Sequence, residues 1–379
     1  MREIVILGST GSIGVQALEV IAANPDKFKV VALAAGGSNI ATLITQAQEF
    51  GVGVVGVNSN GAQARSLAGN INVIDGAHAN EEIAAIPCDI VLNGISGSIG
   101  LAPTLAALAV GNKVALANKE SLVAGGNLVT AFGLDRIIPV DSEHSALYQC
   151  FMAGSMPEVK RAILTASGGA FRDRTDLSNV TLSEALAHPT WAMGPMVTIN
   201  SATLVNKGLE IIEAHYLFNL PYSQIDAVIH PQSVVHSMVE FIDGATIAQF
   251  SPPNMKGPIA YALGAPHRVA HATAAIDWST GHSWNFAPID ESRFPAINLA
   301  RHCGNRGGGL PAVFNAANEV AVEAFMKEEL AFSAIVEIVA ATAMRLDSFA
   351  DSPIRDISDV SAIEEDARKV ARSLIVGNK

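Results

Sequence analysis

Short apolar runs rich in β-branched residues alternate with Ala- and Leu-rich segments of helical length through the first 140 residues. The apolar runs are residues 4–7, 30–34, 54–57, 71–74, 90–92, 114–117 and 137–140. The segments of helical length include residues 12–23, 40–50, 101–110 and 121–131. Continuous apolar strands that alternate with helices are typical of a parallel sheet covered on both faces. The pattern predicts a doubly wound, Rossmann-like α/β sheet, with ligands at the carboxyl ends of its strands.

The pattern of apolar and polar residues changes after Glu143. Apolar and polar residues alternate in 234–241 and 246–250, which predicts antiparallel strands with one exposed face. From about Phe294 the chain has helical periodicity again. We therefore expect four parts: a doubly wound domain (1–142), an α+β domain (143–265), a linker (266–293) and a helical C-terminal domain (294–379).

The chain of 379 residues carries a formal charge of −12 at pH 7, which argues against nucleic acid or an anionic membrane surface as partner. Residues 90–112 contain no charged side chain and could span a bilayer by length. Asn93, Pro103 and several glycines favour a buried strand, a turn and a helix instead. Three scattered cysteines and a beginning without signal-peptide features suggest a reducing cytoplasm.

A glycine-rich loop, Gly8-Ser9-Thr10-Gly11-Ser12-Ile13-Gly14, follows the first strand and opens a helix. Such glycines let the backbone approach a pyrophosphate that rests on the helix N-terminus. A plain strand-to-helix turn is the alternative, but the complete context favours a dinucleotide site. The second strand ends in 34–39 without the Asp or Glu that usually holds the ribose of NAD, so we expect NADP(H).

Two carboxylates, Asp141 and Glu143, follow the seventh apolar run. On an extended chain they would share one face, where their oxygen atoms suit Mg²⁺ or Mn²⁺. The alternative is an acidic strand end in water, and the pair alone does not decide between them.

Four other segments carry side chains suited to chemistry. Residues 117–120 (ANKE) follow a strand, although a helix start with surface charges would look the same. Residues 201–210 (SATLVNKGLE) combine hydroxyls, an amide and an ammonium that could bind phosphate, or form an ordinary Ser-capped helix. Residues 165–171 (TASGGAF) could cradle an oxyanion. Residues 188–194 (HPTWAMG) could form a lid, or a surface turn packed by its Trp.

The motifs GSTGSIG, ANKESLVAGG, PVDSEHSAL, ASGGAFR, HPTWAMG, NSATLVNKGLEIIEA and HPQSVVHSMVEF occur in this order along the chain. Together they closely resemble the 1-deoxy-D-xylulose 5-phosphate reductoisomerase family over nearly the whole length. The resemblance implies a cytoplasmic, homodimeric enzyme that dimerises through the middle domain. It would rearrange a sugar phosphate and reduce the product with NADPH to 2-C-methyl-D-erythritol 4-phosphate, in non-mevalonate isoprenoid biosynthesis.

The resemblance also assigns roles to individual residues. It implies that Asp141, Glu143 and Glu210 hold the metal and, with Lys119, carry the catalysis. The substrate would be bound by Lys119, Ser142, Glu143, Ser167, His188, Ser201, Asn206, Lys207 and Glu210. The NADPH site would comprise Thr10, Gly11, Ser12, Ile13, Gly36, Asn118, Glu120 and Gly194. Trp191 and Met193 would belong to the closing loop.

This sequence departs from the family pattern at one point that concerns the cofactor. Many members carry a basic residue near Gly37 and Ser38, which is missing here. Two other functions stay open from the residues: a metal-independent NAD(P) dehydrogenase, and a dinucleotide-binding sensor with a degenerate site. Sensitivity to a chelator separates the first from a reductoisomerase, and substrate-dependent oxidation of NADPH excludes the second.

Overall fold

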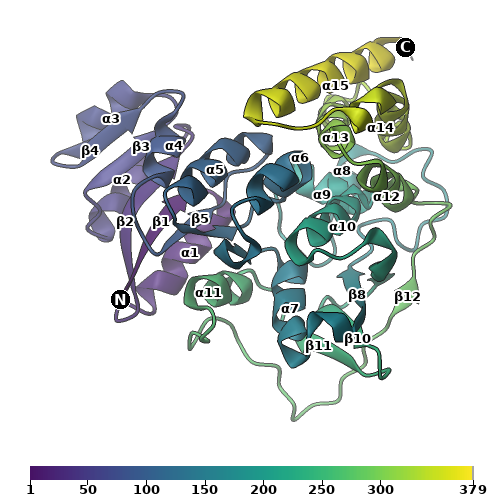
Figure 1. Cartoon of the computed structure of the whole chain (residues 1–379), viewed down its shortest axis with the longest axis horizontal. Coiled ribbons are helices and arrows are strands. Elements are labelled where there is room, and N and C mark those ends of the chain that lie inside the picture. The colour runs from purple at the N-terminus through teal and green to yellow at the C-terminus, as the bar shows by residue number, and fades with distance from the viewer. Residues whose placement is uncertain (378–379) are drawn as a thin grey trace. The chain divides into compact units, whose positions relative to one another are not determined.

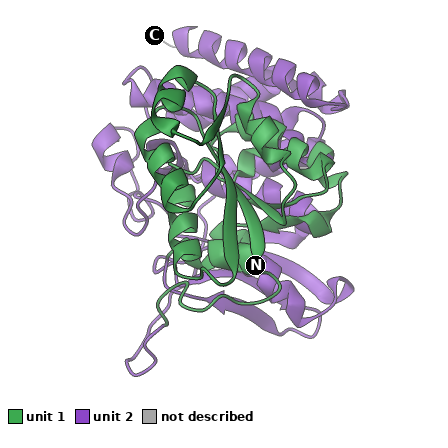
Figure 2. Ribbon diagram, turned by 90° about the vertical axis from the view of Figure 1, so that its left-hand side faces the viewer, with its two compact units in different colours: residues 1–121, 128–145, 254–275 green, residues 122–127, 146–253, 276–379 purple. Residues whose placement is uncertain are grey.

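The computed structural model describes residues 1–377, which fall into two compact units (Figure 2). Unit 1 comprises Met1–Ser121, Leu128–Ser145 and Asn254–Ala275. Unit 2 comprises Leu122–Asn127, Ala146–Pro253 and the chain from Ile276 onward. The four-part division expected above stays a prediction, because a grouping by proximity does not establish which parts fold on their own.

Unit 1 is built on a seven-stranded parallel sheet of order β4-β3-β2-β1-β5-β6-β7 (Figure 1). Its strands are β1 (Arg2–Leu7), β2 (Phe28–Ala35), β3 (Val54–Val57), β4 (Asn72–Asp75), β5 (Ile90–Asn93), β6 (Lys113–Leu116) and β7 (Ile137–Pro139). All seven predicted strands exist, with small differences at their ends. The strand order reverses between β1 and β5, and in such sheets the ligand crevice lies at that point.

Five helices of unit 1 follow its strands as the alternation predicts, and a sixth comes much later in the chain. They are α1 (Ser12–Ala22), α2 (Ile40–Glu49), α3 (Gly61–Ala68), α4 (Ala79–Ala84), α5 (Leu101–Ala109) and α11 (Lys256–Gly264), with short 3-10 turns η1 (Ser98–Gly100) and η2 (Leu134–Arg136). Two further helices belong to both units: α6 (Lys119–Thr130) begins and ends in unit 1, with Leu122–Asn127 in unit 2, and α7 (Ser142–Cys150) begins in unit 1 and continues into unit 2. The uncharged stretch 90–112 forms β5, η1 and α5, as predicted. Within residues 1–377, no helix combines the length and apolar character that crossing a membrane requires.

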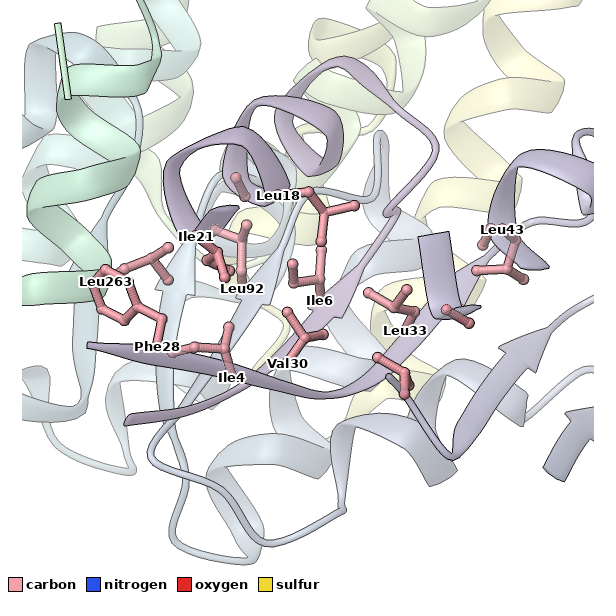
Figure 3. Packing of buried hydrophobic residues seen from close by; sticks show 14 of the residues in the cluster. Ile4, Ile6, Leu18, Ile21, Phe28, Val30, Leu33, Leu43, Leu92 and Leu263 are labelled. Atoms are coloured by element: carbon pink, nitrogen blue, oxygen red, sulfur yellow. The ribbon is translucent and has the colours of Figure 1, made fainter. Parts of the chain in front are cut away.

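The core of unit 1 includes a helix that the sequence reading did not assign to it. In Figure 3, Leu18 and Ile21 of α1 point toward the strands, and Leu263 of α11 lies beside Phe28. Arg2 fastens the end of α11 by donating to the carbonyls of Leu263 and Ala265, each at 2.8 Å. A fully buried Leu or Ile stabilises a fold by about 1.5–3 kcal/mol, so burial holds α11 to this sheet.

Unit 2 contains a five-stranded mixed sheet of order β11-β10-β8-β9-β12. Its strands are β8 (Val159–Ala166), β9 (Ile225–Ile229), β10 (Val235–Phe241), β11 (Thr246–Phe250) and β12 (Ala287–Pro288). The β10–β11 pair is antiparallel, as its alternation predicts, whereas β8 and β9 are parallel.

Helices make up the rest of unit 2. They are α8 (Leu182–Leu186), α9 (Pro195–Ala202), α10 (Val205–Phe218), α12 (Ala296–Arg306), α13 (Leu310–Met326), α14 (Ala334–Arg345) and α15 (Ile357–Gly377). The 3-10 turns are η3 (Phe151–Ala153), η4 (Met156–Glu158), η5 (Tyr222–Gln224) and η6 (Asp347–Asp351). The helical C-terminal region thus has the character expected from the sequence, and α13 packs against both α14 and α15.

Candidate functional site

The glycine-rich loop has the geometry that a dinucleotide site requires. Gly8 has φ of +75°, and a Cβ there would lie 2.9 Å from the carbonyl oxygen of Gly94. A Cβ on Gly14 would lie 2.4 Å from the carbonyl oxygen of Gly8, so α1 and the loop pack too closely for any other residue. These positions therefore need glycine for the tight turn and the helix contact, which fits the binding of a pyrophosphate. The four residues implied for the cofactor, 10–13, lie in this loop and are exposed or half-buried.

Asn118, at the end of β6, ties neighbouring loops together at the carboxyl edge of the sheet. The nitrogen of its buried side-chain amide lies 2.6 Å from the carbonyl oxygen of Ile95 and 2.7 Å from that of Gly97, the two acceptors for its two hydrogens, and 3.2 Å from the carboxylate of Glu120. Its Oδ1 accepts the backbone N–H of Ser121 at 2.9 Å, which caps the start of α6. Asn118 thus fixes the shape of this edge, where the switch point of the sheet predicts the cofactor crevice.

Lys119 and Asp141 meet at the ends of adjacent strands. Lys119 opens α6 after β6, Asp141 follows β7, and the ammonium lies 2.9 Å from the carboxylate. Their side chains are only 12% and 14% exposed, so Lys119 is not the surface charge that a plain helix start would carry. The fully buried His144 also faces Asp141, with 3.3 Å between Nδ1 and Oδ1. Sequence reasoning gave His144 no role, although it follows Asp141 by three residues.

The chain is not extended through Glu143, so the argument that Asp141 and Glu143 share one face of a strand is wrong. β7 ends at Pro139, and α7 begins at Ser142. Asp141 caps this helix: its Oδ1 accepts the N–H of Glu143 at 3.2 Å, and its carbonyl accepts the N–H of Ser145 at 2.8 Å. A carboxylate at a helix start satisfies otherwise unpaired N–H groups and favours the turn.

The turn still brings the two carboxylates together. Ligand oxygens of Asp141 and Glu143 lie within 4.8 Å of each other. Ser142 donates its hydroxyl hydrogen to the Glu143 carboxylate at 2.5 Å. The turn that a substrate contact by Ser142 requires is therefore present, although the contact itself stays a prediction.

In unit 2, three residues predicted for the site converge on one face of α10. Asn206 and Lys207 each donate to a different oxygen of the Glu210 carboxylate, as residues three and four apart on a helix can. Lys207 and Glu210 are 3% and 1% exposed. Glu213 is also buried, at 1% exposed, one turn further along the helix. Sequence reasoning missed Glu213, whose i+3 spacing from Glu210 could have indicated it.

Ser167 and His188 form a second pair in unit 2. Ser167 follows β8, and its hydroxyl lies 3.0 Å from Nε2 of His188. Nδ1 of His188 accepts the backbone N–H groups of Thr190 (3.1 Å) and Trp191 (2.9 Å). Because Nδ1 is an acceptor, the proton of the neutral ring lies on Nε2 and can be donated. Burial, and secondly the charge of Arg172, lower the pKa of His188 and favour this neutral form.

The glycine turn after β8 brings Ser201 to the same region. Gly169 has φ of +66°, and a Cβ there would lie 2.6 Å from the carbonyl oxygen of Ser201, near the end of α9. The turn therefore packs directly against α9, which only glycine allows. Ser167 and Ser201, both predicted to bind substrate, are thus positioned by one tight contact.

Trp191, Met193 and Gly194 lie in the segment between α8 and α9. The Trp191 ring is half-buried, and its centroid lies 6.2 Å from that of His236. This contact is compatible with both expectations for the segment, a lid or a turn packed by its Trp. His236 is 3% exposed and was not selected from the sequence, although its motif was among those that carried the resemblance.

Comparisons with known proteins match nearly the whole chain. Three family models match: 1-deoxy-D-xylulose 5-phosphate reductoisomerase over residues 4–126, its C-terminal domain model over 137–218, and the DXP reductoisomerase C-terminal domain over 250–370. The 1-deoxy-D-xylulose 5-phosphate reductoisomerase of Rhodococcus jostii is 56% identical, covering 98% of this chain and 94% of that protein. The enzyme of the same name from Kitasatospora griseola is 52% identical, covering 98% of this chain and 100% of that protein.

Solved structures agree. The Zymomonas mobilis reductoisomerase in complex with NADPH is 38% identical, with a TM-score of 0.91 over 99% of this chain and 98% of that one. A DOX-P reductoisomerase in complex with NADPH, fosmidomycin and magnesium is 37% identical, with a TM-score of 0.92 and the same coverage.

Proposed function

The chain belongs to the 1-deoxy-D-xylulose 5-phosphate reductoisomerase family, and we propose how its own residues divide the work of that reaction. It is an oxidoreductase that converts 1-deoxy-D-xylulose 5-phosphate to 2-C-methyl-D-erythritol 4-phosphate with NADPH and a divalent metal ion, a step toward isoprenoid precursors. The observation that carries this conclusion is 56% identity to a reductoisomerase across 98% of the chain.

The proposed metal ligands are Asp141, Glu143 and Glu210. Carboxylate oxygens are the hard ligands that Mg²⁺ and Mn²⁺ prefer, and oxygens of the first two lie within 4.8 Å of each other. A bound ion would supply Lewis-acid polarisation of the substrate oxygens. Glu210 is buried with both oxygens hydrogen-bonded, so its orientation is set before any ion arrives.

Lys119 is proposed to stabilise negative charge that develops on a substrate oxygen during the rearrangement. Its ammonium is held 2.9 Å from Asp141, beside a proposed ligand, and is largely covered. A fixed positive charge in a covered site stabilises an oxyanion more than one in water does.

The substrate's phosphate is proposed to bind in unit 2, to Ser167, His188, Ser201, Asn206 and Lys207, with Ser142 contacting the substrate nearer the carboxylates. Neutral His188 can donate from Nε2, and Lys207 brings a positive charge to the same unit. Anchoring the phosphate far from the reacting carbons lets binding energy orient the rest of the molecule.

The NADPH site is proposed to comprise the 10–13 loop, Gly36, Asn118, Glu120 and Gly194. The glycine contacts at Gly8 and Gly14 support a pyrophosphate there, and Asn118 fixes the adjoining loops. Trp191 and Met193 are proposed to close over the ligands and exclude water.

A chelator experiment tests the function. We expect NADPH oxidation that depends on deoxyxylulose phosphate, falls to background with EDTA and returns when Mg²⁺ or Mn²⁺ is added in excess. Absorbance at the nicotinamide band measures it. Turnover that persists in EDTA would indicate a metal-independent dehydrogenase, and NADPH binding without any turnover would indicate a sensor.

A homodimer formed through the middle region and a cytoplasmic location are also proposed. The first follows from family membership. The second fits three cysteines that form no disulfide among residues 1–377. Sedimentation equilibrium at micromolar concentration should give twice the chain mass, and cell fractionation should place the protein with cytoplasmic markers. A monomer, or recovery outside the cytoplasm, would contradict the respective proposal.

A further inference from the structure

The end of β2 is where a doubly wound fold distinguishes NADPH from NADH, because the ribose 2′ position lies there. An acidic side chain at this point selects the diol of NADH, and a basic one accommodates the 2′-phosphate of NADPH. This chain has neither. No ionisable residue occurs between Lys29 and Glu49, nor between Glu49 and Arg65, a span that includes the ends of both β2 and β3.

Two loops are fastened together at this edge. The hydroxyl of Ser59, after β3, donates to the carbonyl of Gly36 at 2.9 Å, and the side-chain amide of Asn60 donates to the carbonyl of Gly37 at 3.0 Å. Gly37 has φ of +106°, and a Cβ there would lie 2.4 Å from the carbonyl oxygen of Ser59. The turn after β2 therefore has one shape, which the β3 loop enforces.

Several hydrogen-bond donors of this turn have no acceptor among residues 1–377. Among residues 1–377, none accepts a hydrogen bond from the backbone N–H of Gly37, Ser38 or Asn39, or from the Ser38 hydroxyl. Ser38 and Asn39 are exposed, and nothing lies within 4 Å of where a Cβ of Gly36 would be. Consecutive N–H groups in a turn form a concavity that binds anions.

The first basic residue that follows the β3 loop in the sequence is already paired. Arg65 of α3 holds the Asp75 carboxylate at 2.5 Å, and this hydrogen bond keeps the pKa of Asp75 below its usual range. Asp75 therefore stays ionised at neutral pH and compensates the charge of Arg65.

We propose that this chain selects NADPH with uncharged donors: the Ser38 hydroxyl and the N–H groups of residues 37–39 hold the 2′-phosphate. Ser59 is a positioning residue, since its one hydroxyl hydrogen is used to hold Gly36. The proposal rests on the proposed function for the presence of NADPH, and it goes further by naming what reads the phosphate.

The test measures dissociation constants of the full-length protein for NADPH and for NADH, in Mg²⁺, by nicotinamide fluorescence. We expect the native chain to bind NADPH at least about tenfold more tightly than NADH, since charge-assisted hydrogen bonds outweigh neutral ones. Ser38→Asp should weaken the binding of NADPH by about tenfold or more, because the new carboxylate repels the 2′-phosphate. The dissociation constant for NADH should change by less than about twofold. Ser38→Ala should weaken the binding of NADPH by about two- to tenfold and leave the binding of NADH unchanged.

Arg65→Gln is the matched control, because it removes the positive charge of α3, the helix that follows the β3 loop. It should leave the NADPH-to-NADH ratio unchanged. A loss of NADPH selectivity in Arg65→Gln would overturn the proposal, because Arg65 would then be the residue that recognises the 2′-phosphate. Equally weakened binding of both cofactors to Ser38→Asp would overturn it too. An unfolding temperature equal to that of the native chain shows that each variant is folded.

Failure of this inference is distinguishable from failure of the proposed function. Selective NADPH binding that responds to Ser38→Asp, without turnover of deoxyxylulose phosphate, would support the inference and contradict the function. Full turnover of deoxyxylulose phosphate, with a ratio of NADPH to NADH affinity that does not change in the residue-38 variants, would support the function and contradict the inference.

Discussion

Replacing Asp141 by Asn is expected to lower kcat by at least about a hundredfold, while the dissociation constant for NADPH changes by less than about twofold. Altering even an outer partner of a metal ligand commonly costs about 10- to 100-fold, so loss of a ligand charge should cost more. Asp141 also holds Lys119 at 2.9 Å, so the substitution weakens the placement of a second catalytic group. The glycine loop lies elsewhere on the sheet edge and should bind NADPH as before.

Asp135→Asn is the matched control for that experiment. It makes the same chemical change six residues earlier, at an exposed position on η2, and should leave kcat within about twofold, as surface substitutions usually do. Steady-state kinetics over a range of Mg²⁺ concentrations gives both values, and fluorescence titration gives the affinity for NADPH. Near-normal turnover of Asp141→Asn at low Mg²⁺ would remove Asp141 from the metal site.

The parallel sheet could be predicted because its signal is local. Each strand of unit 1 is a short apolar run that its own residues define, and alternation with helices leaves few other folds. The sheet against which α11 packs could not be predicted from such local patterns. Its apolar residues do not indicate which sheet they cover, whereas the burial of Ile259 and Leu263 with the residues of β1 and β2, and the hydrogen bonds from Arg2, show that α11 belongs to unit 1.

The candidate site was predictable in its residue types more than in its geometry. Asp141 and Glu143 were recognised as a pair, but the reasoning assumed a strand where Asp141 caps a helix. Capping depends on where a strand stops, which is the least certain feature of a sequence reading. Contacts between segments distant in sequence, such as that of Trp191 with His236, leave no local pattern.

Lys207 illustrates how a structural contact sharpens a functional prediction. From the sequence it could bind phosphate or belong to an ordinary helix. The structure adds that its side chain is 3% exposed and that its ammonium is hydrogen-bonded to Glu210, a proposed metal ligand. A buried ammonium is costly unless it is paired, so Lys207 could serve by holding Glu210 alone, by binding phosphate, or by both.

The substitution Lys207→Met separates these roles, because it keeps much of the bulk and removes the charge. If Lys207 binds the phosphate, KM for deoxyxylulose phosphate should rise by about ten- to hundredfold, since a hydrogen bond to a charged group contributes about 1.5–3 kcal/mol. A smaller fall in kcat should accompany it, through the loosened Glu210. Lys160→Met, at a lysine that is 59% exposed and paired with Glu240, is the control and should change KM by less than about twofold.

The split between KM and kcat decides the assignment. A large fall in kcat with KM unchanged would mean that Lys207 acts only by positioning Glu210, and the phosphate site would have to be sought among other residues. Lys207→Arg separates an effect on substrate binding from a loss of stability. It retains the charge that offsets the buried carboxylate, and so it preserves stability better than Met does. If Lys207→Arg unfolds at the same temperature as the native chain and still shows the raised KM, then KM depends on the shape of the ammonium group rather than on stability. That result is expected of a group that contacts the phosphate oxygens directly.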